Sequence, residues 1–143
     1  MIIRRGLVTD LFELSRLWRC MVKESEPTLN PDLEMWRDYA VSLMRYDGYF
    51  MFVAEANDTI IGFVDYAMQP EPGKGIWVAT INYFYVVPDY RRTDVSGQLW
   101  EKAIESAKGN KAVEFSAICF PDRLDFWERH GFTKQSIGIR RTL

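Results

Sequence analysis

Apolar residues recur at two different periods along the chain, and the switches between these periods mark the expected helices and strands. Apolar positions three or four residues apart predict a first helix face, formed by Leu11, Leu14, Leu17, Trp18 and Met21. The same spacing recurs over residues 33–44 and again over 95–107. Between these two stretches, the runs 49–56, 59–68 and 76–87 are rich in β-branched and aromatic residues. They predict three consecutive strands.

Residues that favour helix ends and turns refine this order. Asp10 is a candidate N-cap with Glu13 three residues later, and Asn30-Pro31 is typical of the start of the second helix. The stretch 24–29 between the two helices is expected to be a loop. Asn57-Asp58 predicts a tight hairpin turn between two of the strands.

Shorter elements complete the chain at both ends. We expect a strand at residues 2–5, a strand at 111–119, a short helix at 122–131 and a final strand at 132–141. The predicted order is β-α-α-β-β-β-α-β-α-β, which is an α/β arrangement with a mixed sheet and helices on both faces. The length of 143 residues suits one domain, spanning 1–143.

Composition narrows the class of protein. Hydrophobic residues make up 48% of the chain and aromatic residues 15%, which is ample for a packed core. The net charge of −2 gives no reason to expect a nucleic-acid partner. We expect a soluble cytoplasmic protein with no membrane partner, because no apolar run approaches the roughly 20 residues of a membrane span. Cys20 and Cys119 fit no metal or redox spacing and suit a reducing compartment.

The sequence carries few of the residues on which common catalytic sites depend. His130 is the only histidine, which excludes a Ser-His-Asp triad or a histidine-rich metal site, and we expect no bound metal. The most informative segment is the run 83–100, where an aromatic strand meets a Pro-containing turn with two arginines and then the start of a helix. Such a junction is suited to holding a pyrophosphate, because helix N-termini and successive backbone N–H groups bind anions.

The segments "YVVPDYRRTDVSGQLWEKAIESAK" and "DFWERHGF", in the predicted element order, resemble the GNAT superfamily of acyl-CoA-dependent N-acyltransferases. The resemblance implies transfer of an acetyl group from acetyl-CoA to a primary amine of a small molecule or peptide, by direct attack. It also implies that the protein could form a homodimer. The cofactor-binding residues it implies are Val86, Val87, Arg91, Arg92, Thr93, Asp94, Val95, Ser96, Gly97 and Trp127. Among these, the backbone near Val86 and Val87 would pair with the pantetheine arm, and the loop 91–96 would offer N–H groups to the pyrophosphate.

Several residues depart from the pattern of this family. Asp94 stands where a glycine is expected, Ser96 where a glycine or alanine is expected, and Trp127 where a tyrosine often protonates the leaving thiolate. Asp94 either turns away from the loop or caps the following helix and competes with the pyrophosphate for its N–H groups. The alternative interpretation is therefore a GNAT-fold protein that has lost acetyl transfer and acts as a binding or structural module.

The remaining candidates are weaker. The resemblance places Tyr83 and Asn82 on the central strand, where relatives carry a base or a group that holds water. Asn82 could orient water, and Tyr83 could equally be a packing residue. Glu24 lies in the region that often lines the acceptor site, although a solvated loop explains it as well. Asp65 could face solvent or a groove, and the sequence leaves both open.

Overall fold

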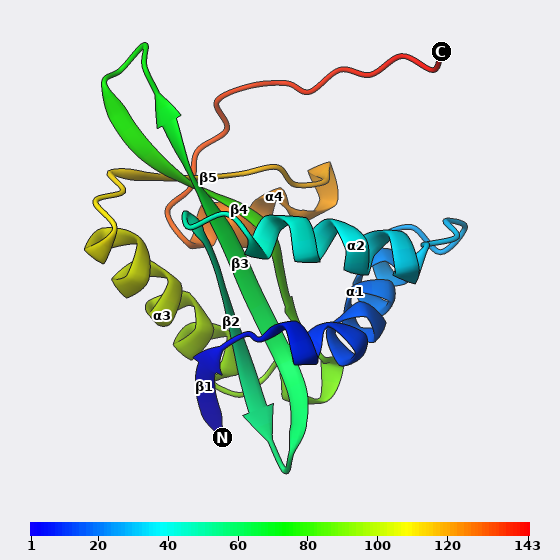
Figure 1. Ribbon diagram of the computed structural model, residues 1–143. Helices are drawn as coiled ribbons and strands as arrows, with labels where there is room; N and C mark the ends of the chain where they lie inside the picture. The colour runs from blue at the N-terminus through cyan, green and yellow to red at the C-terminus, as the bar shows by residue number, and fades with distance from the viewer.

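A five-stranded mixed sheet forms the centre of the molecule in the computed structural model, which describes residues 1–143 (Figure 1). The spatial order of the strands follows the sequence. The first three pairings are antiparallel, and the last pairing is parallel. The strands are β1 (Ile2–Arg5), β2 (Tyr49–Ala56), β3 (Thr59–Glu71), β4 (Ile76–Val86) and β5 (Glu114–Ala117).

Helices cover both faces of this sheet. One face packs against the first two helices, and the other packs against the third (Figure 1). The helices are α1 (Leu11–Ser25), α2 (Leu33–Met44), α3 (Val95–Gly109) and α4 (Leu124–Arg129). Short 3-10 turns precede α1, α3 and α4: η1 (Val8–Asp10), η2 (Pro88–Tyr90) and η3 (Pro121–Arg123). None of the helices is both long and apolar enough to cross a membrane.

The apolar faces predicted from spacing build two separate cores. Leu99 and Ala103 of α3 are fully buried against Val64 and other residues on one side of the sheet. Leu14 of α1 and Trp36 of α2 are buried on the other side. Because successive strand residues point to opposite faces, the central strands are apolar on both sides. The predicted α/β class, with a mixed sheet and helices on both faces, is confirmed.

Two predicted boundaries are wrong. α1 continues to Ser25, so that Glu24 is a helical residue rather than part of a loop. The N-cap of α2 is Asp32 rather than Asn30, because the Asp32 carboxylate accepts the Met35 N–H at 2.9 Å. Asn57 and Asp58 do form the expected tight turn, with φ of 51° and 60°, which is typical of a two-residue hairpin.

The expected final strand over residues 132–141 is not formed. After Phe132 the chain has no strand pairing and leaves the sheet (Figure 1). Ile137 and Ile139, which lie within this range, are 77% and 90% exposed. A strand is stable only when a neighbour pairs with its backbone groups, and these residues lie against no such neighbour.

Candidate functional site

The central strand β4 changes its surroundings halfway along its length. Its first half pairs with β5, from Val78 opposite Glu114 to Ile81 opposite Ala117. No pairing with β5 continues beyond Ile81, although β4 runs on to Val86. The pairing with β3 also shifts at this point, because Tyr83 lies opposite Asp65 and Ile81 opposite Tyr66. Asn82 is therefore the extra residue of a bulge, and β4 is open on one side beyond it.

The register of β4 shows which backbone groups face this open side. The Val87 N–H donates to the Ile61 carbonyl at 2.9 Å. Hydrogen-bonded and non-hydrogen-bonded pairs alternate along an antiparallel ladder, so the next pair, Gly62 and Val86, is not hydrogen-bonded. The N–H and C=O groups of these two residues point away from each other. The Val64–Phe84 pair lies two residues further along and is likewise a non-hydrogen-bonded pair. The N–H groups of Phe84 and Val86 thus face the open side.

Val86 and Val87, the two valines predicted to bind the pantetheine arm, therefore differ in which way their backbone groups point. Val86 directs its backbone groups to the open side, and its carbonyl accepts the Arg91 Nε–H at 2.8 Å. Val87 has no free backbone group, because its carbonyl accepts the Tyr90 N–H at 3.0 Å and its own N–H is used within the sheet. The Val87 backbone is thus engaged within the protein, whereas Phe84, which alternates with Val86 along the strand, also turns its N–H to the open side.

The first turn of α3 leaves three backbone donors without a partner. The first hydrogen bond of this helix runs from the Gln98 N–H to the Asp94 carbonyl at 3.0 Å. The N–H groups of Val95, Ser96 and Gly97 precede it and donate to no protein group. Free donors and a positive helix end together favour an anion at this position.

Asp94 occupies the N-cap position of α3 without acting as a cap. Its carboxylate accepts no hydrogen bond from the helix backbone. It lies over the first turn instead, where a Cβ built on Gly97 would be 2.7 Å from Asp94 Oδ1. Its only hydrogen bond there comes from Gln98 Nε2 at 3.4 Å. Of the two roles left open for Asp94, the structure does not form the cap: the N–H groups stay free, but a negative charge remains beside them.

Arg91, the residue that matches the family pattern best, is held by other parts of the protein. Its Nη2 lies 2.6 Å from Glu24 Oε2, and its guanidinium lies over the Tyr85 ring at 5.3 Å. The Tyr85 hydroxyl donates to the other Glu24 oxygen at 2.7 Å. Burial and this carboxylate raise the pKa of Tyr85 above its usual range. Glu24 therefore links α1 to the loop, a role that the sequence did not reveal.

Arg92, Thr93 and Asp94 of the loop are exposed. Thr93 is fixed by its hydroxyl, which donates to the Tyr90 carbonyl at 2.6 Å. Arg92 is exposed and takes part in none of the ion pairs of the chain. It is the loop cation that remains free for an anionic ligand.

Trp127 lies on the α3 side of the open part of β4. Its ring is 6.4 Å from that of Phe84 and 5.0 Å from that of Phe132, with both pairs edge to face. The indole thus borders the opening from α4. None of Trp127, Phe84 and Phe132 can serve as an acid near neutral pH. The two phenylalanines carry no polar group, and the indole N–H of the tryptophan is only a hydrogen-bond donor.

The candidate catalytic residues lie at the bulge. Tyr83 points to the α1/α2 side, with its ring 6.5 Å from Trp36, and burial raises its pKa above the usual value. The Asn82 Nδ2 atom is buried and makes no hydrogen bond. Trp18 and Trp36 stack at 5.6 Å and complete an aromatic surface beside Tyr83. We call Trp18, Trp36 and Tyr83 the aromatic wall.

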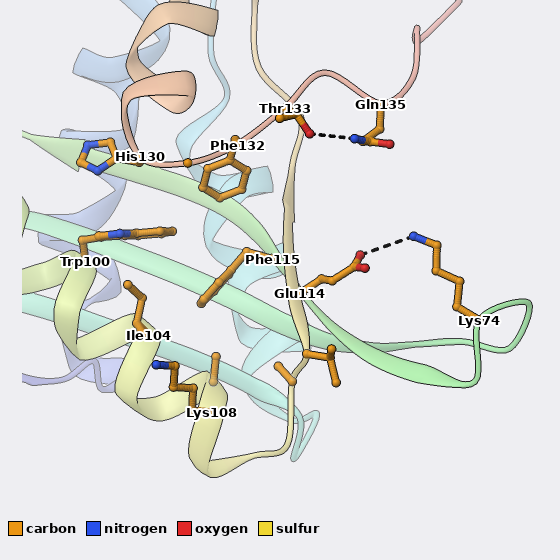
Figure 2. A pocket seen from close by; sticks show the side chains of 14 residues that line it. Lys74, Trp100, Ile104, Lys108, Glu114, Phe115, His130, Phe132, Thr133 and Gln135 are labelled. Carbon is orange, nitrogen blue, oxygen red and sulfur yellow. Dashed lines mark hydrogen bonds and ion pairs between the residues drawn. The ribbon is translucent and has the colours of Figure 1, made fainter.

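A separate hollow lies away from this region. Its volume is about 640 Å³, and it lies between α3, β5 and residues 130–135. Figure 2 shows Trp100, Phe115 and Phe132 on its sides. Lys74 and Glu114 form an ion pair of 3.5 Å at its rim. None of the residues from Arg91 to Gly97 lines it. It is not the predicted cofactor site. No group of His, Cys, Asp or Glu side chains is arranged to hold a metal ion.

Comparisons with known proteins show the family and the fold. A sequence model described as "Acetyltransferase (GNAT) family" matches residues 11–132. No protein with a curated description matches the chain.

Solved structures share the fold at low sequence identity. A transcriptional regulator from Bacillus halodurans C-125 is 21% identical, with 99% of each chain covered and a TM-score of 0.81. A ribosomal-protein-alanine N-acetyltransferase from Brucella melitensis biovar Abortus 2308 is 19% identical, with 99% of each chain covered and a TM-score of 0.77. A predicted acetyltransferase with acetyl-CoA from Clostridium acetobutylicum is 15% identical, with 99% of this chain and 95% of that chain covered and a TM-score of 0.81. At these identities the likeness shows the fold alone.

Proposed function

The chain belongs to the acetyltransferase (GNAT) family, and we propose that it transfers an acetyl group from acetyl-CoA to a primary amine of a small molecule or peptide. One observation carries this proposal: the open side of β4 leads directly to the unpartnered first turn of α3. A ligand with an extended amide-containing arm and a pyrophosphate at its end matches both features.

The residues present fit such a ligand at two places. The N–H groups of Phe84 and Val86 face the open side and can pair with an extended arm as a neighbouring strand would. The N–H groups of Val95, Ser96 and Gly97 can hold the pyrophosphate, with the exposed Arg92 beside them. Asp94 and the engagement of Arg91 weaken this fit.

Acetyl-CoA would supply the thioester, whose carbonyl carbon bonds to the amine nitrogen as its C–S bond breaks. The amine loses one proton in this step, and the leaving thiolate gains one. Asn82 stands at the point where β4 becomes open, so its free amide can orient the amine or a water that takes the proton. Trp127 cannot protonate the thiolate, and water is the proposed acid.

The α1/α2 side of the opening suits a cationic amine. Trp18 and Tyr83 of the aromatic wall are half-buried, and Trp36 is buried against them. Aromatic faces attract cations. Glu24 adds a carboxylate near the loop. The relative from Brucella melitensis carries the name of an enzyme that acts on a ribosomal-protein alanine, and a peptide amine is one acceptor class that this side could receive.

The test is an acetyl-transfer assay with acetyl-CoA and a panel of amines: peptides with free α-amines, peptides with free lysines, polyamines and amino sugars. We expect release of free thiol that depends on one amine class, with the acetylated product identified by mass spectrometry. Thiol release that no amine accelerates would contradict acetyl transfer to an amine.

The alternative is a binding or structural module that keeps the fold without acetyl transfer. Two observations favour it: Arg91 is engaged by Glu24, and the Asp94 charge lies beside the first turn of α3. This alternative predicts no acetyl-CoA binding even at millimolar concentration, and no thiol release with any amine in the panel.

A further inference from the structure

Asp65 of β3 is a buried carboxyl group with no cation beside it. Only 1% of its surface is exposed, and it lies at the centre of the sheet on the α1/α2 side. Burying a carboxylate is unfavourable unless hydrogen bonds compensate for the lost water. Burial raises the pKa of Asp65 to about 7, and donors around the carboxylate act in the opposite direction. A group that is this costly to bury needs a structural or functional reason.

The hydrogen bonds of Asp65 tie three strands together. Its Oδ1 accepts the backbone N–H of Tyr83 on β4 at 2.8 Å. Its Oδ2 accepts the hydroxyl of Tyr49 on β2. The Asn82 amide is close enough to lower the pKa of Asp65 but makes no hydrogen bond of good geometry. One carboxyl group therefore holds β2 and β4 from its position on β3.

The Tyr83 contact lies at the bulge where β4 becomes open. A bulge disrupts the ladder of backbone hydrogen bonds and leaves the extra residue unpaired. Here the side chain of Asp65 accepts the Tyr83 N–H, immediately after the extra residue Asn82. The pairing of β4 with β5 ends at Ile81, the residue before the bulge. The bulge and the opening thus coincide.

We propose that Asp65 is a positioning residue for acetyl transfer, which holds the bulge at Asn82 and so fixes the opening between β4 and β5. This role rests on the proposed function. An apolar side chain at position 65 would leave the Tyr83 N–H buried without an acceptor, which is unfavourable. A strand β4 without the bulge would restore an acceptor, because residue 82 would then pair with β3 in a regular ladder. Such a ladder would shift the side chains beyond it to the opposite face. Phe84 and Val86 would then no longer present their N–H groups to the opening.

Few titratable groups face Asp65. A change measured at Asp65 between pH 5 and 9 can therefore be assigned to Asp65 itself. They are Tyr49 from β2 and Tyr83 from β4. Tyr39 of α2 affects these two tyrosines. None of the groups that shift the pKa of Asp65 is a cation.

The first experiment follows the wild-type protein by NMR between pH 5 and 9. We expect the Asp65 carboxyl carbon to titrate with a midpoint near 7, and the Tyr83 amide signal to move with the same midpoint. A Tyr83 amide that does not follow Asp65 would overturn the link between them. This measurement needs neither substrate nor enzymatic activity.

The second experiment compares Asp65→Asn, Asp65→Ala and a control, Ser15→Ala. Asn keeps an oxygen that can accept the Tyr83 N–H, whereas Ala does not. Ser15 is the other buried polar residue and lies in α1, away from the opening. We expect Asp65→Ala to lower kcat at least tenfold and to speed hydrogen exchange over residues 82–86. Asp65→Asn should restore kcat to within about threefold of wild type.

The outcomes separate this role from the proposed function. Asp65→Ala with kcat within twofold of wild type, or Asp65→Asn as inactive as Asp65→Ala, would overturn the positioning role while acetyl transfer stands. If Asp65→Ala does not fold, the activity of Asp65→Asn and the titration of the wild-type protein still test whether Asp65 positions β4. Absence of acetyl-CoA binding by wild type would overturn the proposed function and the role in transfer, whereas the NMR and exchange data would still decide whether Asp65 holds the bulge.

Discussion

The two halves of β4 belong to one strand, yet they are built for different tasks. Residues 78–81 have strands on both sides, and their backbone groups are used within the sheet. Residues 82–86 have only β3 beside them. The change needs no interruption of the strand, because one extra residue at Asn82 alters the register. The open edge thus begins where β5 ends at Ala117, next to the register shift at Asn82.

The strongest way to test the open half of β4 is to remove one of the donors at its end. Ser96→Pro removes an N–H in the first turn of α3, where the helix itself does not use it. A hydrogen bond to a charged group contributes about 1.5–3 kcal/mol, so we expect acetyl-CoA affinity to fall about tenfold or more. Calorimetric titration measures the change.

Ser96→Ala is the matched control, because it removes the hydroxyl and keeps the N–H. It should bind acetyl-CoA within about twofold of wild type, and both variants should show similar thermal unfolding. Equal affinity of Ser96→Pro and wild type would place the pyrophosphate elsewhere.

Acetyl-CoA should bind more tightly when the charge of Asp94, beside the free N–H groups at the start of α3, is removed. Like charges about 4 Å apart repel by about 1–4 kcal/mol, depending on the local dielectric, and Asp94 is exposed and screened by salt. We expect both Asp94→Asn and Asp94→Gly to tighten acetyl-CoA binding about three- to tenfold. The gain should shrink as salt is raised.

Glu105→Gln is the control for net charge, since Glu105 is an exposed residue further along α3. It should leave the affinity unchanged. If it produces the same gain as Asp94→Asn, the effect reflects the charge of the whole protein rather than the position of Asp94.

A smaller effect should come from releasing Arg91. Partly exposed ion pairs contribute about 0–1 kcal/mol, so Glu24→Gln should let Arg91 exchange partners at little cost. We expect acetyl-CoA binding to tighten about two- to fivefold in this variant. Tyr85→Phe removes the other donor to Glu24 but leaves Arg91 held. It should show no such gain, and a gain in both variants would contradict the exchange of partners.

The smallest expected effect concerns proton donation to the leaving thiolate. Trp127→Tyr replaces a group that is only a donor with a phenol, whose pKa is near 10. We expect kcat to rise about two- to threefold, with the KM for acetyl-CoA little changed. Trp127→Phe keeps the aromatic contact with Phe84 and lacks the hydroxyl. A rise in both variants would show that ring size rather than acidity is responsible.

Local pattern predicted much of the fold, because the periods of apolar residues reflect burial on one face. The contacts that define the site depend on residues far apart in the chain, which local pattern cannot reveal. Arg91 meets Glu24 across 67 positions, and the bulge depends on how β3 and β4 align. The final strand failed for the same reason: the alternation at Ile137 and Ile139 is local, whereas a strand requires a partner.

The resemblance could not assign the side chains of the loop. It named Arg91 as a cofactor-binding residue and left two roles open for Asp94, and both depend on where each side chain turns. The structure turns Arg91 toward Glu24 and leaves Asp94 without a helix N–H. The contact of Arg91 depends on Glu24, a neighbour that the motif does not contain.

The most direct test of the central claim is calorimetric titration of the purified protein with acetyl-CoA at low and at moderate salt. The open side of β4 and the free first turn of α3 predict micromolar binding, about 8 kcal/mol, which weakens as salt is raised. No heat of binding at millimolar acetyl-CoA, at either salt concentration, would contradict the claim that this opening holds the acetyl donor.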